Sequence, residues 1–452
     1  MAATLLAAAA CGAETSNSKT TYDLKQPASV GQMQAVQAVL EVRGELKLNP
    51  DGSKVTKVPL LVEGNLAYEE RFVDTQPTPW SRRSVRYYTK AEARIKVDEG
   101  LLAPKLPEEW RTVCAQVDAD RSLIYSPMGP LKREQLDLID VQGNSLLLPR
   151  LLPEQPVRIG DRWEIDPSIL ARLLGLDVVV DSNVTCSLND VEGQTAIIEI
   201  SGNVEGAVGG VSSEIEFRAK SNYDLSQNLI TWFAVAMREK RAIGHAEPGF
   251  EVTARLRVTI APLAKSEKLT DAYLTELPLE ASPGAGLLSF QAEKARFQLI
   301  HDRRWRSMLD RRDLCVLRLV DRGDLIAQCN ISELPESEPG KQMSLEAFQA
   351  DVQRSLGDKF GQIVEGSKST TEDGKCVLRV LVAGMESEIP IQWVYYHVSN
   401  DAGRRAAIAF TLETKLVERF AEADRTLIET FQFADQPEPI EARLDATGES
   451  RS

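Results

Sequence analysis

The stretch Val85-Arg86-Tyr87-Tyr88-Thr89-Lys90-Ala91-Glu92-Ala93-Arg94-Ile95-Lys96-Val97 shows the pattern that dominates the N-terminal half of this chain. Val85, Tyr87 and every second residue after them alternate with Arg86, Tyr88 and the charged residues that follow. Successive side chains of a strand point to opposite faces of a sheet, so the alternation predicts a long strand with one apolar and one polar face. Such strands are typical of antiparallel sheets that are in contact with water on one side.

The same alternation recurs on both sides of this stretch. It covers residues 40–48 and 252–260, and further strand-like runs cover 178–188, 195–204, 214–223 and 229–241. One helix is marked, because Asp166 can cap it, Pro167 suits its first turn and Gly175 can end it. We therefore expect residues 21–264 to form one large, curved antiparallel sheet with few helices.

The apolar face of this sheet is larger than one short helix can cover. We expect it to close on itself, to pack against the rest of the chain, or to leave a cleft that holds an acyl chain.

The composition changes after this region. Residues 265–288 end in a Gly/Pro-rich run and are the best linker candidate. Residues 289–434 mix strand patterns with a helix at 345–356, capped by Ser344 and ended by Gly357, and a second helix at about 413–430. This order predicts an α+β layered domain. The polar tail 435–452 is predicted to be disordered.

The chain shows three resemblances to known proteins. Gln392-Trp393-Val394-Tyr395-Tyr396, the strand 405–412 and a helix closing at Phe431-Gln432-Phe433 resemble the PsbP-like α/β/α sandwich, a family that is mostly non-catalytic and binds partner proteins. The first domain resembles the half-barrels of bacterial lipoprotein carriers, in which a curved sheet holds an acyl chain. Leu152-Pro153 with the run 157–163 also resembles a segment of uncharacterised β-rich exported bacterial proteins. The resemblances imply an α+β chain with a curved sheet domain followed by a PsbP-like domain.

The N-terminal segment 1–20 indicates export. An Ala/Leu-rich block is followed by Cys11-Gly12-Ala13 and then by a polar run, as at the end of a secretory signal. Residues 8–12 also resemble a bacterial lipobox, so Cys11 is a candidate for lipidation. We expect processing at or near Cys11 and a periplasmic, extracellular or lipid-anchored envelope location. A disordered Ala-rich tail is the alternative.

Charge and chemistry exclude several classes of function. The formal net charge of −14 disfavours nucleic-acid binding. The chain has three histidines, and it has no nucleophile elbow, zincin helix, phosphate loop or Cys-x-x-Cys pair. We therefore expect no catalytic residue, cofactor or metal site. Carboxylates are plentiful, so a hydrolase that uses them remains an alternative.

Two groups of side chains are nevertheless candidates for a disulfide bond and for a docking site. A three-residue loop at Asp321-Arg322-Gly323 would place Cys315 opposite Cys329, as a disulfide or as two packed thiols. A basic cluster offers a docking site for an acidic partner or an anionic lipid headgroup, with the indole as an interfacial anchor. The alternative for this cluster is solvated pairing with nearby aspartates. Its members are Arg303, Arg304, Trp305, Arg306, Arg311 and Arg312.

These observations give three hypotheses of function. The first is a non-catalytic exported protein that binds another macromolecule, such as an envelope protein. The second is a lipid or lipoprotein carrier built on the N-terminal sheet. The third is the carboxylate hydrolase.

Overall fold

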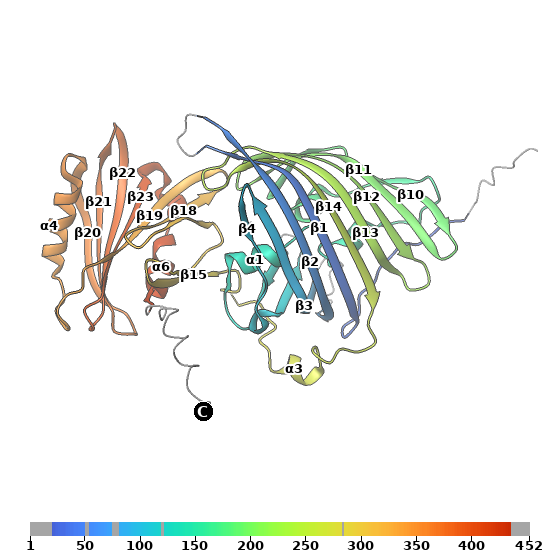
Figure 1. Ribbon diagram of the computed structural model, residues 1–452, viewed down its shortest axis with the longest axis horizontal. Coiled ribbons are helices and arrows are strands. Elements are labelled where there is room, and N and C mark those ends of the chain that lie inside the picture. Colours follow the sequence, from blue (N-terminus) through green and yellow to red (C-terminus); the bar gives the residue numbers. More distant parts are fainter. Residues whose placement is uncertain (1–19, 50–53, 75–80, 119–121, 283, 435–452) are drawn as a thin grey trace, which may run out of the picture.

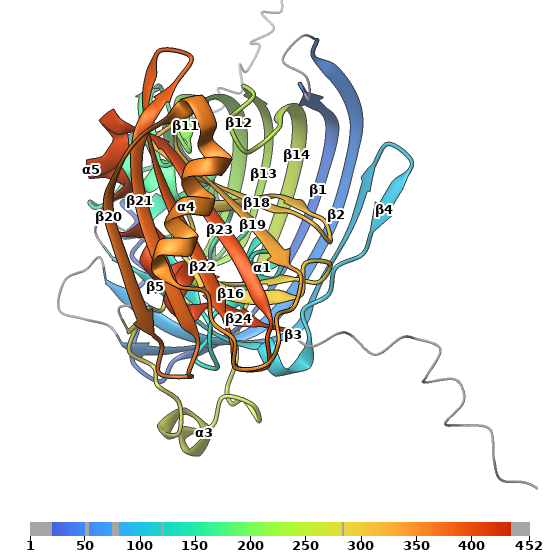
Figure 2. The ribbon, with the colours of Figure 1, turned by 90° about the vertical axis from the view of Figure 1, so that its left-hand side faces the viewer.

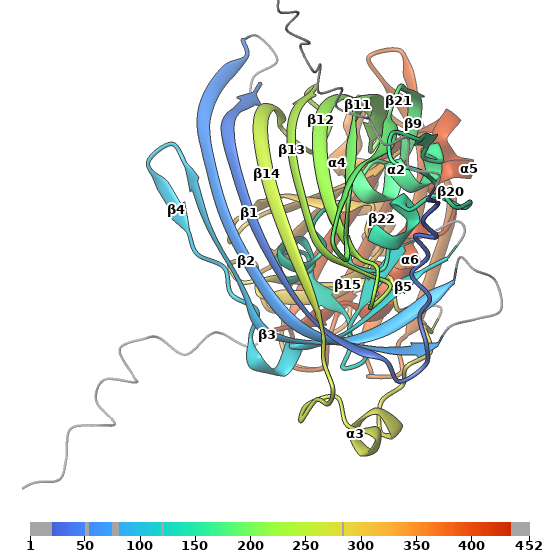
Figure 3. The same ribbon diagram turned by 90° about the vertical axis from the view of Figure 1, so that its right-hand side faces the viewer.

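The computed structural model describes residues 20–49, 54–74, 81–118, 122–282 and 284–434, and it is dominated by antiparallel β-sheet (Figure 1). Cys11 and the tail 435–452 lie outside the described residues. Three sheets account for the strands, and the largest is strongly curved (Figures 1 and 3). The antiparallel, helix-poor architecture agrees with the period-two pattern.

The largest sheet has 13 strands, and its order places the first and last long strands of the domain side by side. Along the sheet the order is β6-β5-β3-β2-β1-β14-β13-β12-β11-β10-β8, with β4 paired to β3 and β9 paired to β11. The strands are β1 Met33–Leu48, β2 Thr56–Asp74, β3 Arg82–Val97, β4 Gly100–Leu102, β5 Thr112–Val117, β6 Ser122–Tyr125, β8 Arg162–Glu164, β9 Val178–Ser182, β10 Thr185–Glu192, β11 Thr195–Val208, β12 Val211–Asp224, β13 Leu229–Arg241 and β14 Gly249–Pro262.

The inner face of this sheet is covered by the connection between β6 and β9. This connection forms α1 (Arg133–Ile139), the 3₁₀ turn η2 (Leu148–Leu151) and α2 (Pro167–Leu174), and its leucines pack into the main core. Helix α2 has the predicted cap, because Asp166 accepts a hydrogen bond from the Ser168 amide and Gly175 adopts φ 71°. The expectation of a single helix over this face was wrong, because α1 and η2 are too short to show a helical period.

The described residues of the segment 265–288 are packed on the sheet and not extended between the domains. Leu269 and Leu274, from α3 (Asp271–Thr275) and the residue run before it, pack with Val85, Cys114 and Tyr125 on the outer face of β3, β5 and β6. Helix α3 lies at one end of the long strands in Figures 1–3. This segment therefore covers a patch of outer face that would otherwise be apolar and exposed.

A β-bulge at Thr89 changes the faces of β3. The pairing runs Ala67 with Lys90 and then Tyr68 with Tyr88, so Thr89 is the extra residue. A bulge of this kind reverses which side chains point inward. Arg86 and Tyr88 are consequently buried on the inner side at 2% and 0% exposure, where the alternation predicts the polar face.

The C-terminal domain is built on a seven-stranded antiparallel sheet with helices on both faces. Its order is β17-β18-β19-β23-β22-β21-β20, and the four-stranded sheet β24-β16-β15-β7 joins it to the first domain. These strands are β7 Leu131–Lys132, β15 Leu288–Ala292, β16 Phe297–His301, β17 Trp305–Asp310, β18 Cys315–Asp321, β19 Asp324–Leu334, β20 Phe360–Thr370, β21 Cys376–Glu386, β22 Ile389–Ser399, β23 Arg405–Glu413 and β24 Gln432–Phe433.

Helix α4 (Leu345–Leu356) covers one face of the seven-stranded sheet, and it begins and ends where the sequence predicts (Figure 2). The opposite face packs against α5 (Val417–Phe420) and α6 (Ala423–Thr430) (Figure 1). The single helix expected at 413–430 is broken, because Ala421 adopts φ 47° between α5 and α6. Among the described residues, no helix is long and apolar enough to cross a membrane.

The register of the β18–β19 hairpin differs from the expected one. Asp321 pairs with Asp324 across a two-residue turn, in which Arg322 and Gly323 have φ 49° and 88°. A register shift after Leu319 then places Cys315 opposite Ile331 and Cys329 opposite Leu317. The predicted pairing of the two cysteines is wrong, and both are buried free thiols.

Candidate functional site

An apolar cavity of about 550 Å³ lies between the inner face of the large sheet and helix α1. Strands β1, β2, β3 and β14 form its floor, and the β3–β4 hairpin forms a side wall. Apart from three carboxylates, every lining residue is aliphatic, proline or glycine. The cavity volume falls within the range of about 300–1,000 Å³ that small-molecule sites occupy.

Small residues at adjacent positions of neighbouring strands account for the empty volume. Leu256, Leu40, Gly64 and Ala93 are paired in one row across β14, β1, β2 and β3. Gly64 has no side chain and Ala93 has only a methyl group, so this part of the inner face is not filled from below. The leucines of η2 pack against another part of the inner face. The part that contains Gly64 and Ala93 remains unfilled and faces helix α1.

The polar groups of the cavity are the three carboxylates Glu92, Glu134 and Asp137. Glu92 is held by Lys90 and Lys105, with N–O distances of 3.1 and 3.4 Å. The carboxylate of Asp137 is accessible to water, with 64% of its side chain exposed, but it sits in a concave region crowded by protein atoms. Loss of hydration there raises the pKa of Asp137 to about 6, although the charges of Arg133 and Arg306 oppose the shift.

A buried ionic network lies beside the cavity and fixes the loop that follows α1. Glu70 Oε1 accepts hydrogen bonds from Arg86 Nε and Ser84 Oγ, both at 2.8 Å. Its Oε2 accepts from Gln34 Nε2 at 2.6 Å and from Ser145 Oγ at 2.7 Å. Burial raises the pKa of Glu70, but the Arg86 charge and these donors outweigh it and hold the pKa below its ordinary value. An ionised Glu70 with four donors is a structural anchor.

Arg86 extends the anchor to the loop and to an aromatic ring. Its Nη2 donates to Asn144 Oδ1 at 2.6 Å, and its guanidinium lies 4.8 Å from the centroid of the Tyr68 ring. The sequence places Arg86 on the solvent face, so sequence reasoning missed this network. The signal in the sequence that could have indicated a partner for Arg86 is Glu70, a carboxylate 16 residues before it.

Helix α1, which roofs the cavity, is attached directly to the C-terminal domain. Strand β7, immediately before α1, pairs with β15. Lys132 Nζ donates to Gln291 Oε1 at 3.0 Å, and Arg133 Nη2 donates to the carbonyl of Arg303 at 2.5 Å. The position of the roof therefore depends on the position of the second domain.

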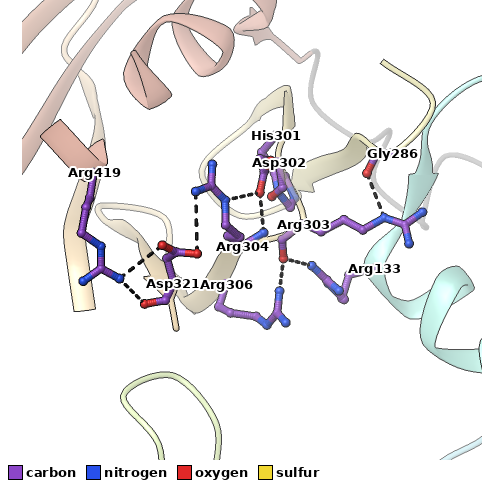
Figure 4. Close-up of polar contacts among 9 residues, drawn as sticks. All are labelled: Arg133, Gly286, His301, Asp302, Arg303, Arg304, Arg306, Asp321 and Arg419. Carbon is purple, nitrogen blue, oxygen red and sulfur yellow. Dashed lines mark hydrogen bonds and ion pairs between the residues drawn. The ribbon is translucent and has the colours of Figure 1, made fainter. Parts of the chain in front are cut away.

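The predicted basic cluster divides into buried, bridging and exposed members. Figure 4 shows the contacts of three of them, Arg303, Arg304 and Arg306. Trp305 is 1% exposed in the C-terminal core, so its predicted role as an interfacial anchor is wrong. The indole points inward because β17 pairs Trp305 with Leu319, a core residue of β18.

Arg303 joins the two domains. Its Nε donates to the Gly286 carbonyl at 2.8 Å (Figure 4). Its Nη2 donates to the Ile124 carbonyl at 2.5 Å. Arg306 Nε donates to Glu247 at 2.9 Å, and Arg304 Nε lies 2.9 Å from Asp302.

Three members of the cluster, Arg304, Arg311 and Arg312, are exposed, and of these Arg304 is paired with Asp302. The side chains of Arg311 and Arg312 therefore take no part in the internal contacts that the other members make.

No group of three or more His, Cys, Asp or Glu side chains is arranged for a metal among the described residues. No family model matches the chain, and no curated protein matches it.

Among solved structures, the chain is similar to cyanobacterial PsbP (CyanoP) from Synechocystis sp. PCC 6803. The identity is 14%, the match covers 34% of this chain and 99% of that one, and the TM-score is 0.25. A lipovitellin structure matches at 10% identity over 57% of this chain and 29% of that one, with a TM-score of 0.28. The outer membrane protein OprD from Pseudomonas aeruginosa matches at 9% identity over 87% and 96%, with a TM-score of 0.12. Similarities this low assign the chain to no family.

Proposed function

We propose that this protein is a non-catalytic, exported binding protein whose N-terminal sheet holds the acyl chain of a lipid or lipoprotein. The observation that carries the proposal is the 550 Å³ cavity, which is apolar except for its three carboxylates. Each buried methylene contributes about 0.8 kcal/mol, so ten of them contribute on the order of 8 kcal/mol before the entropic cost of binding.

The cavity also favours an elongated ligand over a compact polar one. Its floor follows one row of apolar residues across four strands, Leu256, Leu40, Gly64 and Ala93, and none of these four has a hydrogen-bonding side chain. An aliphatic chain needs no polar partner along its length, whereas a sugar or peptide would leave donors and acceptors unsatisfied there.

The C-terminal domain is the adaptor in this proposal, in the manner of a PsbP-like sandwich. Helices on both faces of its sheet support that architecture. Because Arg303 and Arg306 are engaged inside the protein, docking of an acidic partner would use Arg311 and Arg312. Helix α1 would then connect an event on this domain to the cavity.

Uptake of a fluorescent fatty acid by the purified full chain tests the carrier function. Gly64→Leu projects a side chain into the cavity. Within the described part of the chain, the only atom within 4 Å of a Cβ at Gly64 is the Leu40 Cβ at 3.6 Å. We expect this variant to lose uptake. Ala67→Leu, on the opposite face of the same strand, is the matched control and should bind normally. Equal uptake by both variants, or none by the native chain, would reject the proposal.

A further inference from the structure

The polar face of the large sheet contains a second depression, larger than the apolar cavity. It is an open trough of about 890 Å³ across β11, β12, β13, β14 and β1. Its lining side chains, such as Arg218 and Arg255, alternate along their strands with buried residues such as Phe217 and Leu256. The trough therefore opens on the side of the sheet opposite to the apolar cavity.

Two alanines form the floor of the trough, and four basic side chains surround them. Ala236 pairs with Arg218 on β12 and with Arg255 on β14. Ala234 pairs in the same way with Lys220 and Arg257. Adjacent strands lie about 4.8 Å apart, so the two basic walls are separated by about 10 Å, with only methyl groups between them.

Three of the four basic side chains make no ion pair within the described part of the chain, although Glu41 occupies the position of β1 that is paired with Arg255. Lys220 pairs with Glu199 at 3.2 Å. Arg218, Arg255 and Arg257 are exposed and make no ion pair or hydrogen bond within the described part of the chain. Like charges on neighbouring positions of one sheet face repel each other. A bound anion between the two walls would relieve this repulsion.

The outer strands add hydrogen-bonding groups of another kind. Glu41 on β1 and Glu199, Ser201 and Asn203 on β11 line the two sides of the trough, and Glu216 extends the β12 wall. Carboxylates and amide oxygens accept hydrogen bonds from hydroxyl groups, whereas guanidinium groups bind phosphate oxygens in a bidentate manner. Both groups occur together on a phosphorylated sugar.

We infer that the trough between β12 and β14 is a binding site for a phosphorylated carbohydrate. Arg218, Arg255 and Arg257 hold the phosphate groups over the alanine floor. Glu41, Glu199 and Asn203 accept hydrogen bonds from the hydroxyl groups. The trough and the apolar cavity use opposite faces of the sheet, so this inference does not depend on the proposed acyl-chain function.

Isothermal titration of the full chain with glucose 1,6-bisphosphate at low ionic strength tests the inference, with glucose and inorganic phosphate as comparison probes. The double variant Arg218→Gln/Arg255→Gln should lower the affinity by at least about tenfold, since hydrogen bonds to charged groups carry this order of energy. Arg43→Gln, exposed on β1 of the same face but outside the trough, should change the affinity less than about twofold.

Ala236→Glu tests the floor without removing an arginine, because it places a carboxylate between Arg218 and Arg255 at an exposed strand position. This variant should abolish binding of the bisphosphate while fatty-acid uptake is retained. Equal binding by all variants would overturn the site. Inorganic phosphate that binds as tightly as the sugar bisphosphate would overturn the carbohydrate assignment, and so would the absence of binding to the native chain.

Discussion

The carboxylate of Glu70 and the guanidinium of Arg86 form a fully enclosed ion pair at 2.8 Å, with side-chain exposures of 0% and 2%. The two residues lie on adjacent strands, where Glu70 is paired directly with Arg86. The pair holds Asn144 and Ser145, which belong to the loop after α1, against the sheet. It therefore connects the sheet to the segment that covers its inner face.

Breaking this pair should be costly. Glu70→Gln leaves the Arg86 charge buried without a counter-ion, and we expect it to lower the free energy of unfolding by about 3–5 kcal/mol. Arg86→Met and the double variant Glu70→Gln/Arg86→Met complete a double-mutant cycle, and the double change, which removes both charges, should cost less than the sum of the two single changes. Urea denaturation of the four proteins in this cycle measures the coupling.

Glu45→Gln provides the control for that cycle. Glu45 pairs with Lys57 at 2.8 Å, but both side chains are about half exposed. An exposed pair contributes at most about 1 kcal/mol. A Glu70 variant no more destabilised than the Glu45 variant would show that the buried network is not an anchor.

The same region shows what the sequence could and could not predict. The long period-two runs predicted an antiparallel sheet, because alternation over many residues has few other interpretations. They did not predict the faces of Arg86 and Tyr88, because one extra residue at Thr89 reverses the alternation and leaves no local signal. The predicted register of the β18–β19 hairpin was wrong for a related reason. The turn has two residues instead of three, and a register shift between Leu319 and Val320 adds one more position, so Cys315 is displaced by two positions relative to Cys329.

The cavity was only partly accessible to sequence reasoning. The sequence predicts more apolar sheet surface than one short helix can cover. That excess predicted a cleft as one of three outcomes, beside closure of the sheet and packing against the rest of the chain. The covering segment was missed, because Leu146, Leu147, Leu148 and Leu151 lie in turns and a short 3₁₀ helix with no strand or helix period. The basic cluster was found, but its role in joining the domains depends on contacts with Ile124 and Gly286, which are 179 and 17 residues away from Arg303 in the sequence.

Asp137 should make the stability of the protein depend on pH. The pKa of its carboxyl in the folded state is about 6, above the ordinary value of 3.8, so the folded state retains the proton more strongly than the unfolded state. Stability is therefore highest below the ordinary pKa and declines as the pH rises through about 6. Solvent exposure limits the effect to less than about 1 kcal/mol.

Asp137→Asn removes this titration. Above pH 6 the variant should be more stable than the native chain, and the difference should shrink at acidic pH. Thermal unfolding of both proteins across this range measures it. A difference of the same size at every pH would show that the carboxyl is not perturbed.

Arg303 should be required for the attachment of the C-terminal domain to the cavity roof. Arg303→Ala removes the hydrogen bonds to the Ile124 and Gly286 carbonyls, and we expect a loss of about 3 kcal/mol because both involve a charged donor. Hydrogen exchange should also increase in β7 and α1. Arg312→Ala, at an exposed position of the same cluster, should change neither property. If hydrogen exchange in α1 is unchanged in the Arg303 variant, the stability of α1 does not depend on the contact that Arg303 makes between the domains.

The tips of two hairpins, one from each domain, meet at Gly210 and Gly323. A Cβ at Gly210 would lie 2.1 Å from the Gly323 amide nitrogen, so Gly210→Ala must displace the β18–β19 turn. Gly209 is the matched control, because it also has a positive φ, 54° against 72°, but a Cβ there meets no atom within 4 Å. Both substitutions cost about 1–2 kcal/mol for the left-handed backbone. Only Gly210→Ala should also increase hydrogen exchange in β18 and β19 and weaken the contact between the domains. Identical hydrogen exchange in the two variants would mean that the contact between Gly210 and Gly323 does not hold the two domains together in solution.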